Sequence, residues 1–293
     1  MDAGLATRGR ALKTGRQAHW RTGVTKRGAL LTLATFTLAA AVATGQSPPN
    51  SVFIEALTWE EIRDHIQAAH TSILIPTAGT EQKGPHMVMG QHKYVMEYTT
   101  DQIARALGDA LVSPIITYVP EGDWGEEPTG HMRMPGTLTL PENWFRDLLV
   151  HTAKSHAAAG FTDIVFLGDS GGNQRGMSAV TEQLNEEWAG TGQRAHFIGD
   201  YYTKSREDIN SYLATRGYTD EQIGRHAGMV GTSQMLFVNP NHIRPDALAP
   251  RGGFEGSGVS GDPTLASSEL GERLLRIKID NALAQIRASL ATR

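Results

Sequence analysis

The densest group of chemically active side chains falls within twelve residues and comprises Glu81, Lys83, His86 and His92. An apolar run at residues 73–75 precedes this group and predicts a buried strand. In α/β folds, ligands bind where parallel strands end and their loops begin. The spacing therefore predicts an active site in this loop. The alternative is a hydrophilic loop with incidental histidines.

A second loop of suitable composition follows another predicted strand, residues 161–167. It reads Gly-Asp-Ser-Gly-Gly-Asn over residues 168–173. Its small residues let a backbone pass close to a ligand and expose amides at the start of the next helix. Ser170 formally satisfies the Gly-x-Ser-x-Gly pattern of serine hydrolases, but the sequence identifies no His and acid partners for it. Serine chemistry is therefore a minor alternative.

The elements that must position these loops alternate between short apolar strands and amphipathic helices. Thr58 and Glu61 form a capping box, which predicts a helix that runs to about His70. The other expected elements are strands at 72–76, 111–119, 161–167 and 196–200, and helices at 92–107, 141–160, 176–189, 218–226 and 264–290. This alternation predicts an α/β three-layer sandwich, with a mostly parallel sheet covered by helices on both faces.

Four motifs and a later segment resemble the creatininase (creatinine amidohydrolase) family. They are Glu81-Gln82-x-Gly84-Pro85-His86, His131 with Pro135-Gly136-Thr137, Gly171-Gly172-Asn173, His226-Ala227-Gly228 with Thr232-Ser233, and residues 261–266. Order and spacing agree from about residue 58 to residue 285. The resemblance implies a creatininase-like sandwich, hydrolysis of an amide by metal-activated water, and assembly as a homo-oligomer.

The positions that bind two metal ions in that family are mostly substituted here. By resemblance, the family uses a Glu and a His in the first motif, an Asp at the end of that loop, a His in the third motif and a further Glu. Glu81 matches the first of these positions. The other four positions hold Lys83, His92, Ser170 and Gly231. The resemblance therefore implies hydrolase chemistry. Because four of the five ligand positions are substituted, we expect fewer than two metal ions to bind.

A site for one divalent ion, zinc or manganese, can be rebuilt from residues near these positions. Glu81 is the matched ligand, the imidazole of His92 is a good zinc ligand, and Asp169 can supply a third donor if the backbone turns toward the site. Lys83 cannot bind metal while it is charged. Its ammonium can replace the charge of a second ion and hold a substrate oxyanion, pair with Glu81, or act as a base or Schiff-base nucleophile in a metal-free site.

The resemblance also suggests roles for residues elsewhere in the chain. His226 matches the position that assists proton transfer to the leaving group, so it is the predicted acid/base beside Glu81 and Lys83; a buried structural histidine is the alternative. Trp124 lies in an acidic, glycine-rich loop at residues 121–127, which forms either a substrate wall or a solvated turn. The predicted substrate-binding residues are His86, Trp124, His131, Ser170 and Asn173.

Residues 1–45 differ from the rest of the chain. They hold seven basic residues and one acid, and the apolar run at residues 29–43 ends in small residues. This pattern predicts a secretory signal peptide, followed by a linker at 46–57 and a single domain at 58–293. The run is shorter than the ~20 residues that a bilayer requires, so an uncleaved anchor is the lesser alternative. We expect a periplasmic or secreted protein with no stable membrane span after processing.

Composition excludes some classes of function. Of the chain's 27 basic and 31 acidic residues, 20 basic and 30 acidic residues remain without the leader, a net charge of −10. Such an acidic body argues against a nucleic-acid partner, because that binding depends on neutralising phosphates. The chain has no cysteine and therefore no disulfide, thiolate ligand or thiol nucleophile.

The sequence thus predicts an exported, creatininase-like hydrolase that cleaves an amide or related C–N bond of a small molecule with one divalent ion. Two alternatives stay open. One is a non-catalytic small-molecule-binding protein on the same scaffold, and the other is a metal-free lyase or isomerase that uses Lys83. The presence of His and Lys, rather than apolar residues, at two substituted positions favours an active site with altered chemistry.

Overall fold

The computed structural model describes residues 50–250 and 253–292. The predicted signal peptide and residues 46–49 of the predicted linker lie outside the described residues. Residues 50–57 contact the domain: the Val112 amide donates to the Val52 carbonyl at 2.8 Å, and Ile54 and Leu57 pack against the hydrophobic core. Within the described ranges, no helix combines the length and apolarity that a membrane crossing requires.

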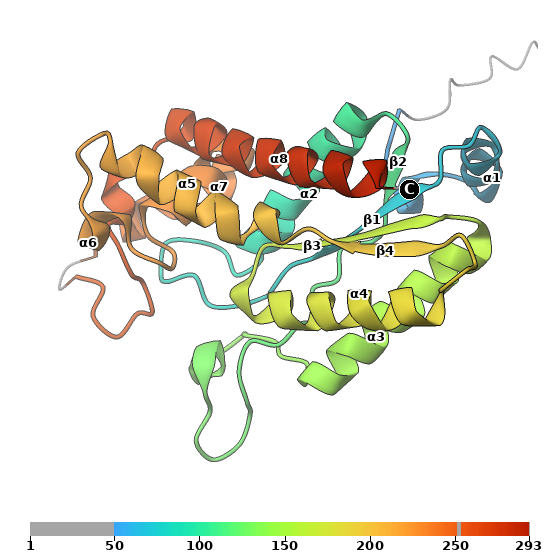
Figure 1. Ribbon diagram of the computed structural model, residues 1–293. Helices are drawn as coiled ribbons and strands as arrows, with labels where there is room; N and C mark the ends of the chain where they lie inside the picture. The colour runs from blue at the N-terminus through green and yellow to red at the C-terminus, as the bar shows by residue number, and fades with distance from the viewer. Residues whose placement is uncertain (1–49, 251–252, 293) are drawn as a thin grey trace, which may run out of the picture. The chain divides into compact units, whose positions relative to one another are not determined.

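A four-stranded parallel sheet forms the centre of the domain, in the order β2-β1-β3-β4 (Figure 1). Its strands are β1 (Ser72–Thr77), β2 (Ala110–Val112), β3 (Asp163–Gly168) and β4 (Arg194–Phe197). All six residues of β1 and of β3 are buried, as expected for parallel strands that are covered on both faces. The carboxyl ends of β1 and β3 lie side by side, with Thr77 opposite Gly168.

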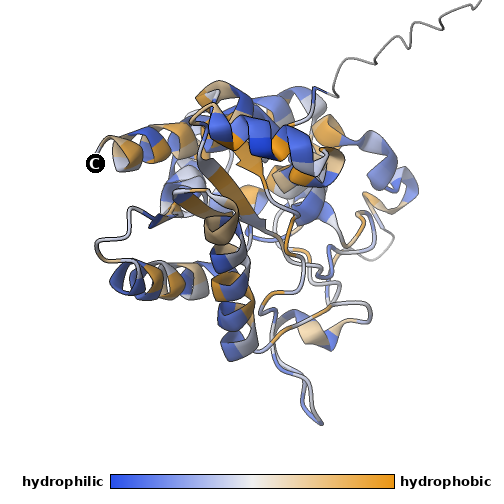
Figure 2. Ribbon diagram, turned by 90° about the vertical axis from the view of Figure 1, so that its right-hand side faces the viewer, coloured by the Kyte–Doolittle hydropathy of each residue, from blue (hydrophilic) through white to orange (hydrophobic). Residues whose placement is uncertain are grey.

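Helices cover both faces of this sheet, which confirms the predicted three-layer α/β sandwich. Alternate residues of β1 point to opposite faces. Ile73 and Ile75 pack with α3 (Glu142–Ala159) and α4 (Gln174–Glu187). Leu74 packs on the other side with α2 (Gln91–Leu107) and α8 (Ser268–Ala291). Figure 2 shows the apolar strands enclosed by helices with hydrophilic outer faces.

The remaining helices lie at the edge of the core and beside α8. They are α1 (Trp59–Gln67), α5 (Thr203–Ala214), α6 (Asp220–Ile223) and α7 (Met229–Val238). The capping box of Thr58 is present, because its hydroxyl accepts from the Glu61 amide at 3.3 Å. The helix α7 packs extensively against α8. Neither α5 nor α7 was predicted from the sequence, although residues of both helices line the cavity.

Two predicted elements are shorter in the structure. The strand predicted at 111–119 ends at Val112, because Pro114 has no amide hydrogen for a sheet ladder. The chain returns to β1 at Ile116, whose carbonyl accepts from the Ala78 amide at 2.8 Å. The helix predicted to reach His226 ends at Ile223, and Gly224 follows it with a φ of 64°. His226 consequently lies in an extended segment that pairs with Ser260.

Candidate active site

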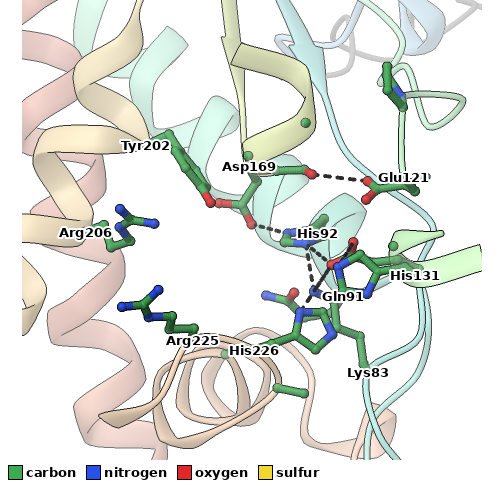
Figure 3. A pocket seen from close by; sticks show the side chains of 18 of the residues that line it. Lys83, Gln91, His92, Glu121, His131, Asp169, Tyr202, Arg206, Arg225 and His226 are labelled. Atoms are coloured by element: carbon green, nitrogen blue, oxygen red, sulfur yellow. Dashed lines mark hydrogen bonds and ion pairs between the residues drawn. The ribbon is translucent and has the colours of Figure 1, made fainter. Parts of the chain in front are cut away.

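A cavity of about 960 Å³ opens at the carboxyl ends of β1 and β3. Such an edge is where ligands bind in parallel α/β sheets. Its wall includes Glu81 and Lys83 from the loop after β1, and Asp169 and Ser170 from the loop after β3. Figure 3 shows that side chains from distant parts of the sequence, including His226, converge on this cavity. The volume is sufficient for a substrate of drug-like size.

Glu81 is the centre of the polar network. Its Oε1 atom contacts the ammonium of Lys83 and lies 2.9 Å from His92 Nε2. Its Oε2 atom lies 3.2 Å from His131 Nε2, and His226 Nδ1 is 3.7 Å from Oε1. Burial by itself would raise the pKa of this carboxyl, but the charge of the adjacent Lys83 outweighs burial and lowers it. Glu81 is therefore an anion surrounded by nitrogen groups.

His92 lies between Glu81 and the carboxylate of Asp169. The ammonium of Lys83 lies 2.7 Å from His92 Nε2 and can only donate, so Nε2 is the acceptor. The ring proton is then on Nδ1, which donates to Asp169 Oδ2 at 2.7 Å. The other Asp169 oxygen pairs with Lys278 of α8. Two buried carboxylates are thus paired with two ammonium groups, and the imidazole of His92 links Lys83 to Asp169.

Asp169 is ionised in this arrangement. Complete burial would raise the pKa of its carboxyl, but Lys278 and the hydrogen bond from His92 lower the pKa to about 2. The ammonium of Lys278 also lies 4.6 Å from the ring centre of Tyr201, so aromatic contact adds to its stabilisation. Each oxygen of Asp169 therefore has its own partner, His92 for Oδ2 and Lys278 for Oδ1.

His226 presents an unprotonated nitrogen to Glu81. Its Nε2 atom lies 2.7 Å from the carbonyl oxygen of Gln82, and this contact requires Nε2 to carry the hydrogen. Burial, assisted by the nearby Lys83 charge, lowers the pKa of His226 to about 4, so the ring is neutral at neutral pH. The lone pair of Nδ1 is then free toward Glu81. A backbone contact of this kind is common for histidines that bind metal ions.

The backbone holds His226 in place through an unusual turn. The Ser260 amide donates to the His226 carbonyl at 2.8 Å. A Cβ atom on Gly224 would lie 2.1 Å from the Ser260 carbonyl oxygen, so only glycine allows the two segments to meet. Ala227, directly after His226, has a left-handed φ of 52°. Strained backbone of this kind is concentrated at functional sites.

His131 contacts the other carboxylate oxygen of Glu81. Its ring stacks on that of His226, with centroids 4.4 Å apart. The Gln82 side-chain oxygen accepts from the Gly84 amide at 3.0 Å, which places the Gln82 Nε2 atom toward His131 Nδ1 at 3.3 Å. His131 Nδ1 therefore accepts, and its Nε2–H donates to Glu81. Burial lowers the pKa of His131.

Glu121 lines the cavity, whereas the sequence placed it only in an acidic loop. Burial and the Glu81 carboxylate raise the pKa of Glu121 to about 9, so its carboxyl is protonated at neutral pH. Its Oε1 atom accepts from the Ser170 hydroxyl at 3.1 Å. A Cβ atom on Gly79 would lie 1.9 Å from this same Oε1, so a glycine at 79 makes room for the carboxyl. The sequence signal was its position just after a predicted strand.

Glu81, His131 and His226 are the residues best placed for a metal ion. One ligand atom from each lies within 4.8 Å of the other two. One carboxylate and two imidazoles form a common ligand set for catalytic zinc, and the Nδ1 lone pair of His226 fits that role. His131 fits after a change of tautomer, which requires the Gln82 amide to turn over.

The metal ligands predicted from the sequence, Glu81, His92 and Asp169, do lie together, but their atoms have other partners. Both nitrogens of His92 and both oxygens of Asp169 are already in contact with protein groups. An ion between them would have to displace the ammonium of Lys83 or Lys278. That set stays a prediction, and the geometry favours the set around His131 and His226.

The structure separates the five predicted substrate-binding residues. Ser170 and His131 line the cavity. His86 is fully buried outside the lining, with Nε2 2.9 Å from the Thr232 hydroxyl. Asn173 is also buried outside it and donates to Thr77 at 3.0 Å. Trp124 is 62% exposed on its loop and is not part of the cavity wall. The geometry thus supports direct substrate contact for two of the five, and structural roles for the two buried ones.

Comparison with known proteins identifies the family of this chain. Residues 55–286 match the family model described as creatinine amidohydrolase. A mycofactocin precursor peptide peptidase from Mycolicibacterium smegmatis is 25% identical over 237 residues, covering 73% of this chain and 84% of that protein. A 3-dehydro-scyllo-inosose hydrolase from Thermotoga maritima is 27% identical over 123 residues, covering 42% of this chain and 37% of that protein.

A solved structure described as "Creatininase Mn" has the same fold. It matches with a TM-score of 0.67 at 21% identity, over 82% of this chain and 98% of that chain. Fold and pocket together define an α/β protein with a carboxylate–imidazole site at the end of a parallel sheet. The family match extends over most of the sequence, and the chain therefore belongs to the creatininase family. The resemblance inferred from the motifs is confirmed.

Proposed function

We propose that this protein is an exported hydrolase that cleaves an amide or related C–N bond of a small molecule. It would use one divalent ion held by Glu81, His131 and His226. The observation that carries the proposal is the convergence of two imidazoles and one ammonium on a single buried carboxylate at the cavity wall. The names of the two relatives, a peptidase and a hydrolase, support hydrolysis as the reaction class.

A bound zinc or manganese ion supplies Lewis acidity, which makes water nucleophilic near neutral pH. In the overall reaction, the water oxygen bonds to the carbonyl carbon, the C–N bond breaks, and a proton passes to the leaving nitrogen. The ammonium of Lys83 supplies positive charge next to Glu81 and stabilises an oxygen that becomes negative in the transition state. This role matches the electrostatic function predicted for Lys83.

Several other groups around the cavity can orient a substrate. The Ser170 hydroxyl lies at the wall, where it donates to Glu121. Gly171 and Gly172 of the same loop also line the cavity, so a substrate can approach the backbone without meeting a side chain. His226 cannot bind an ion through Nδ1 and accept a proton there at the same time. Its predicted acid/base role therefore belongs to a metal-free form of the site.

One observation favours a second function, a non-catalytic binding protein on the same scaffold. Lys83 and Lys278 neutralise Glu81 and Asp169, so these charges are balanced without an ion. The Lys83–Glu81 ion pair argues against a lyase or isomerase that uses Lys83, since an ammonium that contacts a carboxylate is not a nucleophile. Metal binding and turnover distinguish the first two functions.

The experiment that tests the proposal is a hydrolysis screen on the mature protein with added zinc or manganese. Its substrates are small amides, lactams and short peptides, and its readout is the release of amine. We expect metal-dependent release that Glu81→Gln reduces by at least a hundredfold, with Glu97→Gln on the exposed face of α2 as the matched control. Equal release by wild type and Glu81→Gln would overturn the proposal.

Export and assembly are further proposals. The leader supports a periplasmic or secreted location, and the family resemblance supports a homo-oligomer. Fractionation of expressing cells tests the first, with the processed chain expected outside the cytoplasm. Light scattering on the purified protein tests the second, and a monomer mass would contradict it.

A further inference from the structure

Two arginines form a positively charged part of the cavity wall. Arg206 lies on α5, and Arg225 directly precedes His226. Both line the cavity and are exposed to solvent. In Figure 3 their guanidinium groups lie on the same side of the pocket, across from His131. Neither guanidinium forms an ion pair with a residue in the described ranges.

The acidic groups of the cavity have their own partners. Glu81 pairs with Lys83, and Asp169 pairs with Lys278. A third pair at the rim joins Glu142 and Arg175, with 3.4 Å between the charged atoms. Asp123, which also lines the cavity, accepts from the Thr129 hydroxyl at 3.0 Å, and Glu121 accepts from the Ser170 hydroxyl at 3.1 Å.

The two arginines therefore provide unpaired positive charge inside the cavity of a protein whose net charge is −4. An excess of one sign in a cleft attracts ligands of the opposite sign.

Local structure positions both residues. The Arg206 guanidinium lies 6.0 Å from the ring centre of Tyr202, which also lines the cavity. Arg225 follows the tight turn at Gly224, and its backbone amide donates to the Ser260 hydroxyl at 3.2 Å. The segment that fixes Arg225 thus also fixes His226. An anion bound by Arg225 would have a defined position relative to the polar network around Glu81.

We propose that Arg206 and Arg225 bind an anionic oxyacid group, a carboxylate or a phosphate, on the substrate whose C–N bond lies at Glu81. The inference rests on the proposed function of the same cavity. Planar guanidinium groups match the paired oxygens of carboxylates and phosphates. The substrate class is therefore an amide with an acidic group, such as an N-acyl amino acid, a short peptide with a free carboxyl end, or a phosphorylated amide.

The test measures the binding of three matched probes to the mature protein by calorimetry. The probes are N-benzoylglycine, its phosphonate analogue and the uncharged N-benzoylglycinamide. We expect the preferred anion to bind at least tenfold more tightly than the uncharged amide, and the carboxylate and phosphonate arms identify which anion is preferred. Affinity for the anion should fall as salt rises. Equal binding of all three probes would overturn the inference.

Variants connect this preference to the two arginines. Arg206→Gln and Arg225→Gln should each weaken binding of the anionic probe about tenfold and leave the uncharged probe unchanged. Arg→Lys at the same positions should restore part of the affinity, because it keeps the charge but loses the planar fork. Arg287→Gln, on α8 outside the cavity lining, is the control. Unchanged anion binding in both Gln variants would contradict the inference.

Failure of this inference differs from failure of the proposed function. If arginine-dependent anion binding occurs but no C–N bond is cleaved, the inference holds for a binding protein and the hydrolase proposal fails. If metal-dependent hydrolysis occurs with equal efficiency on neutral amides and in the arginine variants, the hydrolase proposal holds and the inference is wrong.

Discussion

The side-chain amide of Gln82 lies 3.3 Å from His131 Nδ1 and decides which imidazole nitrogen carries the proton. Because the Gln82 Nε2 atom donates, His131 holds its proton on the nitrogen that a metal ion would need. Replacing this donor with an acceptor should reverse the tautomer. Substitution of Gln82 should therefore change the metal affinity of the site.

Gln82→Glu should strengthen zinc binding. A carboxylate at this position accepts from His131 Nδ1–H, frees the Nε2 lone pair and makes the imidazole a better ligand. The zinc dissociation constant, measured by competition with a chelating dye, should fall at least about tenfold. Gln67→Glu adds the same charge on exposed α1 and should leave the constant unchanged. A weaker affinity in Gln82→Glu would count against His131 as a ligand.

Lys83→Met should destabilise the protein without metal and make its stability depend on zinc. The change leaves the buried Glu81 carboxylate without its ammonium partner, a loss of about 3 kcal/mol for a pair of this kind. Zinc can then supply the missing positive charge. We would measure the free energy of unfolding in urea, once with chelator and once with zinc. Zinc should increase this free energy more for the variant than for wild type. Equal gains would show that Lys83 and the ion do not share a role.

The Asp169–Lys278 pair should make the free energy of unfolding decrease as pH falls into the acid range. Because the folded pKa of Asp169 is about 2, below its ordinary 3.8, the carboxylate contributes stability above pH 4. That contribution, on the order of 2 kcal/mol, is lost as pH falls from about 4 through 2. Urea unfolding at pH 7 and pH 3 should show that the free energy of unfolding falls less in Asp169→Asn/Lys278→Met than in wild type. The same loss in both proteins would contradict the pairing.

Gly224→Ala should disrupt the segment that carries Arg225 and His226. An added Cβ atom meets the Ser260 carbonyl oxygen at 2.1 Å in addition to the cost of a φ of 64°. Gly190→Ala is a matched control, because Gly190 has a φ of 79° and open space around the added atom. The control should lose about 1 kcal/mol of unfolding free energy, and Gly224→Ala clearly more. Equal losses would show that the close approach has no energetic weight.

Much of the fold could be predicted from the sequence, because its signals are local. The apolar runs at 73–75 and 161–167 belong to buried strands of a parallel sheet, and the Thr58 capping box begins a helix. Pro114 was visible as an irregularity but not as the reason that β2 stops at Val112. The helices α5 and α7 were missed. In α7 the apolar residues surround the helix and give no one-sided pattern.

The site could be predicted only in part. The motifs located Glu81, His131 and His226, but their mutual contact depends on loops that meet through tertiary structure. Lys278 was missed although it lies on the buried face of α8, between Leu274 and Ala282, where an unpaired lysine would be costly. That position was the available signal. Which side chains pair in this network could not be read from spacing alone.

The metal content of the purified mature protein, measured by elemental mass spectrometry after zinc dialysis, tests whether Glu81, His131 and His226 bind one ion. We expect about one equivalent of zinc in wild type, its loss in Glu81→Gln, His131→Gln and His226→Gln, and its retention in His92→Gln. A wild type without bound metal would contradict the account and favour a binding protein. Loss in His92→Gln with retention in His131→Gln would instead support the ligand set predicted from the sequence.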